Sequence, residues 1–260
     1  MTAAEPQLIA SAANPLVKDL RRLAHESTAY RKQQRVWVEG DHLCRAALQR
    51  GWEPAIAVFS QSAWPAEASL VRGEAKVVVL PDALFAFLST LESPSRVGFV
   101  LALPAQPTVQ PLMPTVVLDG LQDPGNVGSI LRSAAAFGFG QVLALKGTAA
   151  LWSAKVLRAG MGAHFGLRLV EQLDVSSLAA LDVPLIATSS HRGDLLHEAQ
   201  LPWPCAWALG HEGKGIAAEL EAAARLSVRI HQPGGEESLN VAAAAAICLH
   251  ASAASRGERL

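Results

Sequence analysis

The chain has little of the chemistry that metals, disulfides and membranes require. Its three cysteines, Cys44, Cys205 and Cys248, lie far apart without Cys-x-x-Cys spacing, so we expect buried thiols instead of metal ligands or disulfides. The eight histidines form no His-Glu-x-x-His pattern or similar cluster, and we expect no metal. No run of about 18 residues is apolar enough to span a bilayer, and the first residues lack the basic and apolar segments of a signal peptide. We therefore expect a cytoplasmic protein.

The composition is that of a compact globular chain. Its 260 residues are enough for two domains with proper cores, and 50% of them are hydrophobic against 17% charged. The formal net charge is only -1, so the chain as a whole is not strongly basic.

The most informative segment runs from an apolar strand through a turn into a helix. The strand Val116–Leu118 is followed by a Pro/Gly turn over residues 123–126, with Asn126 as the expected N-cap and Gly138 at the expected helix end. Arg132 lies six residues after Asn126, less than two helical turns away, so the two side chains can serve one cleft. The alternative is that Asn126 only caps the helix and Arg132 only solvates it.

A second segment, residues 206–216, is an apolar strand that breaks into a glycine-rich loop. Glycine permits positive φ angles and close approach by a ligand, so this loop suits a small molecule. The loop lacks the spacing of a nucleotide-triphosphate loop, has no Ser or Thr after Lys214, and carries Glu212, which would repel a phosphate. Its glycines are Gly210, Gly213 and Gly215.

A third segment, residues 226–247, contains a strand that ends at Ile230 and a helix that begins near Ser238 or Asn240. The helix is almost wholly small or apolar, which allows close approach to other backbone. A buried C-terminal helix with an ordinary polar cap explains part of this pattern, but not the sequence Ser-Leu-Asn at the cap.

Together the three segments resemble the SpoU (TrmH) family of RNA ribose 2′-O-methyltransferases, in the SPOUT superfamily. The three motifs stand in the family's order, each at the end of a strand, and cover the C-terminal part of the chain. The third departs from the usual pattern, because Val241 is followed by alanine, as Val-Ala-Ala-Ala, where a serine is common. The matching residues are Asn126, Gly128 and Arg132; Gly210, Glu212, Gly213 and Gly215; and Ser238 to Val241.

The resemblance implies a C-terminal α/β domain, residues 115–260, with the trefoil knot of SPOUT methyltransferases. True knots are rare, and pattern reasoning alone does not propose one. It further implies a homodimer through the knotted domain and S-adenosylmethionine as cofactor. The residues expected to bind the cofactor are Thr188, Leu209, Gly210, Gly213, Ile230, Ser238 and Leu239.

The chemistry needs no metal, since a methyl group on a sulfonium is already activated. The enzyme must align a ribose hydroxyl behind that methyl group and assist loss of the hydroxyl proton. Arg132 is the residue expected to act; because a guanidinium stays protonated in proteins, orienting the hydroxyl and its phosphate is safer physically than taking the proton. Glu212 is also a possible charge partner of Arg132. The residues expected to position Arg132 and the ribose are Asn126, Glu212, Ser238 and Asn240.

Residues 1–103 predict a smaller N-terminal α/β domain. A helix is expected from Asn14-Pro15, with Leu16, Leu20 and Leu23 on one face. Strands and helices then alternate, and four prolines mark residues 104–114 as a semi-rigid linker. The expected strands are Val36–Val38, Ile56–Phe59, Lys76–Leu80 and Val97–Leu101, and the expected helices are Asp41–Gln49 and Pro81–Leu88.

This first domain resembles the RNA-binding domain that precedes many SpoU catalytic domains. Six basic residues against two acids form a candidate phosphate-tracking patch, although for any single one a solvated helix face is the plainer explanation. The six are Lys18, Arg21, Arg22, Arg31, Lys32 and Arg35.

The sequence thus favours methyl transfer from S-adenosylmethionine to a ribose 2′-hydroxyl of structured RNA, with ribosomal RNA preferred over transfer RNA. Two other classes stay open: a catalytically silent RNA-binding or ribosome-assembly protein, and a small-molecule or base methyltransferase on a related knotted fold. His211, inside the second motif, is either a substrate contact or a variable loop residue.

Overall fold

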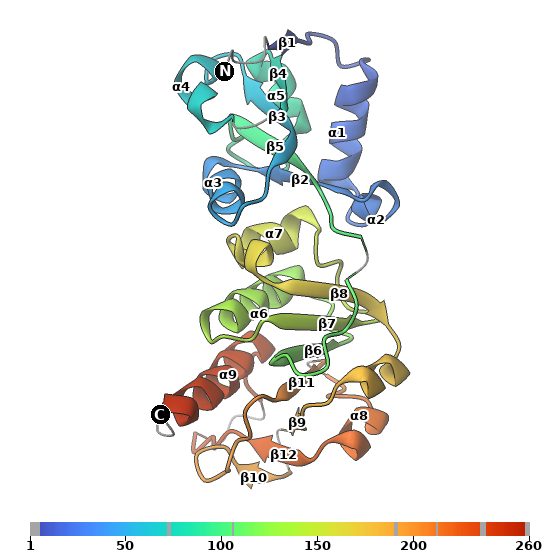
Figure 1. Cartoon of the computed structure of the whole chain (residues 1–260), viewed down its shortest axis with the longest axis vertical. Coiled ribbons are helices and arrows are strands. Elements are labelled where there is room, and N and C mark those ends of the chain that lie inside the picture. The colour runs from blue at the N-terminus through green and yellow to red at the C-terminus, as the bar shows by residue number, and fades with distance from the viewer. Residues whose placement is uncertain are drawn as a thin grey trace. The chain divides into compact units, whose positions relative to one another are not determined.

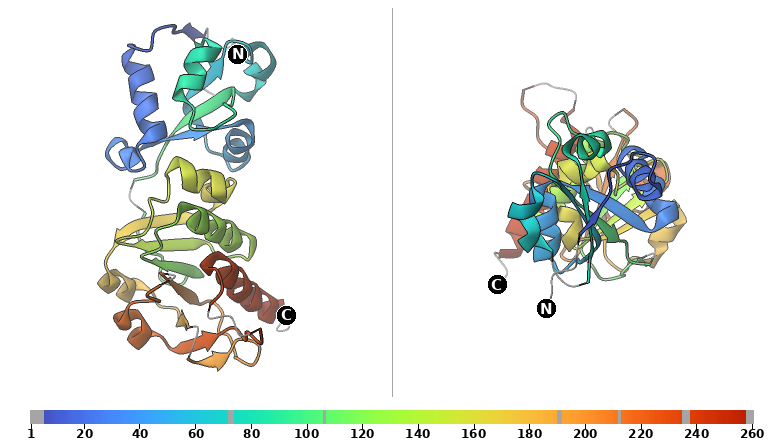
Figure 2. Two further views of the ribbon diagram at one scale, coloured as in Figure 1. Left: turned by 180° about the vertical axis from the view of Figure 1, so that it is seen from behind. Right: turned by 90° about the horizontal axis from the view of Figure 1, so that it is seen from above.

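The structure is a computed structural model that describes residues 6–71, 74–105, 107–189, 192–211, 213–234 and 238–257. Its contacts divide the chain into two compact units. The first contains residues 1–105 and 152–165, and the second contains residues 106–151 and 166–260. Figures 1 and 2 show the elements of each unit.

The N-terminal unit is built on a mixed sheet that, within the described residues, has five strands in the order β1-β4-β3-β5-β2. β4 pairs parallel with β1 and β3, whereas β5 pairs antiparallel with β3 and β2. The strands are β1 (Gln7–Leu8), β2 (Arg35–Glu39), β3 (Pro54–Ser60), β4 (Lys76–Leu80) and β5 (Val97–Ala102). The helices are α1 (Pro15–His25), α2 (Ala29–Gln33), α3 (Asp41–Gln49), α4 (Trp64–Glu67), α5 (Asp82–Leu88) and α7 (Ala154–Gly160), with short 3₁₀ turns η1 (Ala68–Leu70) and η2 (Ala163–Gly166).

The start of α1 follows the predicted capping chemistry. The Asn14 side chain accepts a hydrogen bond from the Leu16 amide at 2.9 Å, and Pro15 occupies the first turn, where its missing N–H costs nothing. The buried face differs in one position from the prediction, because Val17 is fully buried with Leu20 while Leu16 is only half-buried. The four predicted strands and two later helices of this unit are confirmed to within two residues at each end.

Residues 152–165 group with the N-terminal unit because aromatic side chains hold them there. The Trp52 ring lies 5.6 Å from the rings of both Trp152 and Phe165, and the Trp52 indole donates to the Phe165 carbonyl at 3.0 Å. This segment carries α7. The contact boundary between residues 105 and 106 falls inside the expected linker, and the domain limits 1–103, 104–114 and 115–260 stay a prediction.

The second unit is built on a sheet that, in the described part of the chain, has seven strands in the order β10-β12-β9-β11-β6-β7-β8, with parallel pairing throughout. The strands are β6 (Thr115–Asp119), β7 (Gln141–Leu145), β8 (Arg168–Leu173), β9 (Leu185–Thr188), β10 (Asp194–Leu195), β11 (Ala206–Gly210) and β12 (Leu226–Arg229). The helices are α6 (Pro124–Ala136), α8 (Ala218–Ala223) and α9 (Val241–Gly257), with the 3₁₀ segment η3 (Val175–Ala180).

Apolar helices cover both faces of this sheet, as a parallel sheet requires. On one face Val117 and Leu143 pack against Leu220 of α8 and Leu178 of η3. On the other face α6 and α9 pack against each other, and α9 also contacts β11 (Figure 1).

The chain order reverses at β6, which positions the site. From β6 the chain proceeds outward through β7 and β8, then returns to the other side, where β11 lies between β6 and β9. In open parallel sheets, ligands bind beyond the carboxyl ends of the strands at such a reversal. The loops that follow β6, β9, β11 and β12 therefore meet at one edge.

Two other expectations can be checked on the described residues. Cys44, Cys205 and Cys248 are free and buried, as predicted. No described helix is long and apolar enough to cross a membrane.

Trp207 anchors α9 to the centre of the sheet. Its side chain is fully buried on β11, and its indole N–H donates to the Ser252 hydroxyl of α9 at 2.9 Å. We expect Ser252→Ala to lower the free energy of unfolding by about 1–3 kcal/mol, because the indole N–H would lose its partner in a dry site. Urea unfolding followed by tryptophan fluorescence measures this change.

The control for this prediction is Ser255→Ala, on the same helix. Ser255 donates only to the Ser252 carbonyl one turn earlier, so its loss should cost less than about 0.5 kcal/mol. Equal destabilisation by the two variants would contradict the role given to the Trp207–Ser252 hydrogen bond.

Candidate active site

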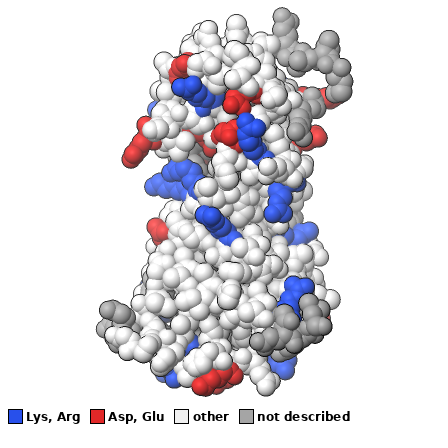
Figure 3. All heavy atoms as spheres, turned by 90° about the vertical axis from the view of Figure 1, so that its left-hand side faces the viewer, with Lys and Arg blue, Asp and Glu red and all other residues white. Residues whose placement is uncertain are grey.

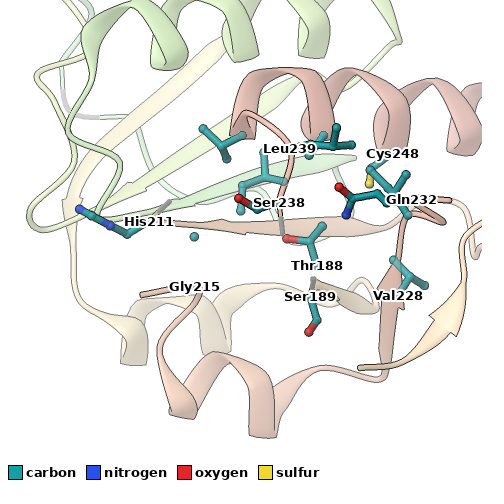
Figure 4. Close-up of a pocket in the computed structure, with 14 residues that line it drawn as sticks. Thr188, Ser189, His211, Gly215, Val228, Gln232, Ser238, Leu239 and Cys248 are labelled. Atoms are coloured by element: carbon teal, nitrogen blue, oxygen red, sulfur yellow. The ribbon is translucent and has the colours of Figure 1, made fainter. Parts of the chain in front are cut away.

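The ends of β9, β11 and β12 and the start of α9 enclose one pocket (Figure 4). Six of the seven residues expected to bind a cofactor line it, and the seventh, Gly213, lies in the adjoining loop and is not among the lining residues. The lining residues are Thr188, Ser189, Leu209, Gly210, His211, Gly215, Val228, Ile230, Gln232, Ser238, Leu239, Val241, Ala244 and Cys248.

Gly210 is required by a close approach of the backbone. A Cβ atom at Gly210 would lie 2.2 Å from the carbonyl carbon of Gly215 and 2.3 Å from the Ile216 nitrogen, where no side chain fits. His211 and Gly215 exchange backbone hydrogen bonds of 3.0 and 2.8 Å across the loop. Gly215 has a φ of +69°, which favours glycine. The glycines therefore fold the loop back onto the end of β11.

His211 is held by this loop. Its Nδ1 accepts from the Gly213 amide at 3.0 Å, so the ring is fixed with Nε2 as its other hydrogen-bonding atom. His211 also lines the pocket, which is the position that a contact with a bound molecule needs.

The sequence analysis missed two residues that hold the site loops. Asp119, at the end of β6, accepts from the Ala217 amide at 2.6 Å and so ties the loop after β11 to β6. Thr148, after β7, donates to the Leu118 carbonyl at 3.0 Å and accepts from the Gly120 amide at 3.2 Å. An acid at the end of a buried strand is a usable sequence signal; for Thr148 the sequence contains none.

A hydrogen bond joins the first and third motifs. The Asn240 amide donates from Nδ2 to Oδ1 of Asn126 at 3.0 Å. The Oδ1 atom of Asn240 accepts from the Ala242 amide at 2.9 Å and the Ala243 amide at 3.3 Å, so Asn240 is the cap of α9. Both ends of the Asn240 amide are thus used, and its orientation is fixed.

The prediction that Asn126 caps α6 is wrong. Asp123 is the N-cap, and its carboxylate accepts from the Asn126 amide at 2.7 Å. The helix begins three residues earlier than expected because Pro124 and Gly125 fit its first turn. The Asn126 side chain therefore does not cap α6, and it accepts the hydrogen bond from Asn240.

Arg132 lies on the exposed surface of α6, and in the described residues its side chain makes no hydrogen bond or ion pair. Six residues of helix turn it about 120° around the axis from Asn126. Ser238 is exposed at the pocket rim. Glu212, the expected partner of Arg132, lies outside the described residues.

Cys248 supplies an uncharged wall of the pocket. Burial raises the pKa of its thiol to about 12, so the thiol stays protonated and unreactive near neutral pH. In the described part of the chain no three His, Cys, Asp or Glu side chains form a group that holds a metal ion.

Part of the expected N-terminal basic patch is engaged within the protein. Arg35 pairs with Asp19 at 2.7 Å, Arg22 lies 3.7 Å from Glu26, and Arg21 stacks over the Phe87 ring at 4.1 Å. Figure 3 draws the side on which α3 and α4 lie in Figure 1, and not the side of α1 and α2; on the drawn face basic side chains are separated by uncharged surface and by acidic side chains. Lys18 and Lys32 are exposed. Together with Arg31, the six remain candidates as a group.

Comparison with known proteins matches two parts of the chain to family models. A model of the SpoU rRNA Methylase family matches residues 113–250, and a model of the MRM3-like substrate binding domain matches residues 14–98. The 23S rRNA (guanosine(2553)-2'-O)-methyltransferase RlmP of Bacillus subtilis is 30% identical over 246 residues, which are 93% of this chain and 97% of that protein.

Solved structures agree with this match. A TrmH-family RNA methyltransferase from Porphyromonas gingivalis is 34% identical with a TM-score of 0.80, over 91% of this chain and 96% of that one. An AdoMet-bound rRNA methyltransferase from Sinorhizobium meliloti is 26% identical with a TM-score of 0.82, over 98% of both chains. Since the family model covers more than half of the sequence and a full-length relative is 30% identical, the chain belongs to the SpoU rRNA methylase family.

Proposed function

We propose that this protein transfers the methyl group of S-adenosylmethionine to a ribose 2′-hydroxyl of ribosomal RNA. The observation that carries the proposal is the Asn126–Asn240 hydrogen bond, which joins two motifs 114 residues apart, beside the Ser238 and Leu239 rim of the pocket. The named activity of RlmP of Bacillus subtilis, ribose methylation of 23S rRNA, supports it.

The pocket residues fit this cofactor. Leu209, Val228 and Ile230 give apolar walls for a planar base, as small-molecule pockets provide. The cofactor also carries hydroxyl and amine donors, and the buried Oε1 of Gln232 has no hydrogen-bond donor among the described residues. We assign cofactor binding to Thr188, Leu209, Gly210, Ile230, Ser238 and Leu239, with Gly213 shaping the loop.

When bound, the cofactor supplies a methyl group already activated on a sulfonium. The protein must then hold the ribose hydroxyl in line with that group and accommodate the proton that leaves. Arg132 is exposed and without an internal partner among the described residues, so its five N–H donors are available to the hydroxyl and the adjacent phosphate. The fixed Asn126 and Asn240 amides position the ribose beside it, together with Ser238 and Glu212.

Ribosomal RNA is favoured over transfer RNA by the N-terminal match to a substrate-binding domain and by the rRNA substrate named for RlmP. Lys18 and Lys32 are exposed and have no acidic partner among the residues that the structure describes, so they are the first candidates for phosphate contacts. A location in the cytoplasm stays a prediction.

We also propose the trefoil knot and a homodimer formed through the second unit. After β12, near one edge of the sheet, the chain returns to pack α9 on β11 and α6, which supports a threaded path. One face of α9 is exposed and mainly small or apolar, with Ile247 at its centre at 42% exposure. The other exposed members of this stripe are Ala243, His250 and Ala254. A second copy of this chain is the occupant we assign to it.

The first experiment is methylation of unmodified total RNA with methyl-labelled S-adenosylmethionine, followed by separation of ribosomal from transfer RNA and digestion to nucleosides. We expect label in a 2′-O-methylnucleoside from ribosomal RNA. Arg132→Ala should lower the rate at least about 100-fold, because Arg132 acts on the reacting hydroxyl, while calorimetry should show cofactor affinity changed by less than about twofold.

The matched control is Arg225→Ala, because Arg225 is an exposed arginine of the same unit outside the pocket. It should retain full activity. Label in a base would contradict ribose methylation, label in transfer RNA would contradict the substrate class, and cofactor binding without any label on naked or ribosome-assembled RNA would favour a silent RNA-binding protein.

Asn240→Asp separates the two hydrogen-bonding roles of Asn240. A carboxylate still caps α9, so the free energy of unfolding should change by less than about 0.5 kcal/mol. The donor to Asn126 is lost, and methyl transfer should fall about 10- to 100-fold. Denaturant unfolding and single-turnover methylation measure the two effects; unchanged activity would refute the positioning role.

Ile247→Arg tests the dimer. A charge at the centre of the exposed α9 stripe should convert a dimer into monomers, because it would be desolvated in the interface. Light scattering after size-exclusion chromatography measures the mass. Leu8→Arg, on an exposed leucine of the N-terminal unit at 76% exposure, should leave the mass unchanged; a monomeric unsubstituted protein would rule out this assembly.

A further inference from the structure

Gln232 is a pocket residue that none of the three motifs accounts for. It follows β12 by three positions and lines the pocket with Val228, Ile230 and Cys248. Figure 4 shows its amide group pointing into the pocket, toward Ser238. A polar side chain is thus directed into the apolar part of the cavity.

The Oε1 atom of Gln232 is buried and has no hydrogen-bond donor among the described residues. Buried amide oxygens in folded proteins are nearly always paired, because an unpaired one has lost its hydrogen bonds to water without replacement. An amide oxygen accepts only from an N–H or O–H group. The atom is therefore arranged to receive a donor that the described residues do not supply.

We propose that Gln232 recognises the exocyclic amine of the cofactor's adenine by accepting a hydrogen bond at Oε1, and so selects an aminopurine over other bases. This inference rests on the assignment of the pocket to S-adenosylmethionine. The methionine ammonium is the other strong donor of that molecule. The neighbours of Gln232 favour the adenine amine: Val228, Ile230 and the un-ionised Cys248 suit a flat ring, whereas an ammonium placed among these three apolar or uncharged side chains would be desolvated.

The test is a binding experiment with Gln232→Met, a substitution of similar length that removes the acceptor. The ligands are S-adenosylhomocysteine and its 6-deamino analogue, which has hydrogen in place of the exocyclic amine and offers no substitute donor. Dissociation constants come from isothermal titration calorimetry on the full-length protein. The comparison of two ligands on two proteins isolates the one hydrogen bond.

We expect the unsubstituted protein to bind S-adenosylhomocysteine about five- to tenfold more tightly than the 6-deamino analogue. Gln232→Met should weaken S-adenosylhomocysteine by the same factor and leave the analogue within about twofold. The melting temperature without ligand should not fall, because methionine removes an unpaired buried oxygen. A melting temperature of the free protein that does not fall, together with weaker binding of S-adenosylhomocysteine, is a pattern that a purely structural glutamine would not produce.

Three outcomes would overturn the inference. Equal weakening of both ligands would make Gln232 a packing residue. Weakening of S-adenosylhomocysteine without weakening of 5′-methylthioadenosine, which lacks the amino-acid part, would assign Oε1 to the ammonium. A similar loss in Gln49→Met, an exposed glutamine at the end of α3, would show that the effect is not specific to the pocket. Failure of the unsubstituted protein to bind S-adenosylhomocysteine would instead reject the assignment of the pocket itself, and so the two failures are distinguishable.

Discussion

The site depends on the position of one strand. β11 pairs with β6 over five residues and with β9 over three, and this double pairing fixes where the glycine-rich loop emerges. Every residue of β11 except Gly210 is buried, and its Trp207 side chain anchors α9 by a hydrogen bond to Ser252. Displacement of β11 would therefore move the loop and the cap of α9 together. The proposed chemistry is thus positioned by a buried strand that is paired on both sides.

Short polar contacts connect that strand and its neighbours to the loops at the edge of the sheet where the pocket lies. Asp119 ties the loop after β11 to β6, and Asn240 ties the start of α9 to Asn126 on α6. The first contact uses the Ala217 backbone amide, which the local structure would otherwise leave without a partner. The second uses the Asn240 side chain, which is already fixed because it caps α9. The residue closest to the proposed chemistry, Arg132, is by contrast exposed, which suits a group that must contact a macromolecule approaching from solvent.

The two units are organised differently. The second unit is a wholly parallel sheet with helices on both faces, and its pocket is formed by loops at the strand ends. The first is a mixed sheet, and several of its basic side chains are already paired within the unit, as Arg35 at the start of β2 is with Asp19 of α1. A proposed phosphate-binding surface there relies on charges such as Lys18 and Lys32, which have no acidic partner among the described residues, more than on the count of basic residues.

The sequence by itself determined much of this protein. Asn14 and Pro15 start α1 as predicted, four of the strands of the N-terminal unit lie within two residues of the predicted limits, and three motifs identified the family. These features are local: a cap, a turn glycine or an apolar alternation has its effect within a few residues of chain. The predicted cap of α6 is wrong by three residues because Asp123 and Asn126 are both good N-cap residues, and Pro124 suits the first helical position after Asp123.

Only the tertiary structure decided how distant parts meet. No local pattern shows that Asn126 contacts Asn240, that Asp119 holds the amide of Ala217, or that the Oε1 of Gln232 is buried without a donor among the described residues. Those facts depend on the insertion of β11 between β6 and β9, a non-local pairing whose free energy comes from the whole sheet. The sequence motifs thus identify most residues of the site, whereas the order of the strands in the sheet determines which of these residues are in contact.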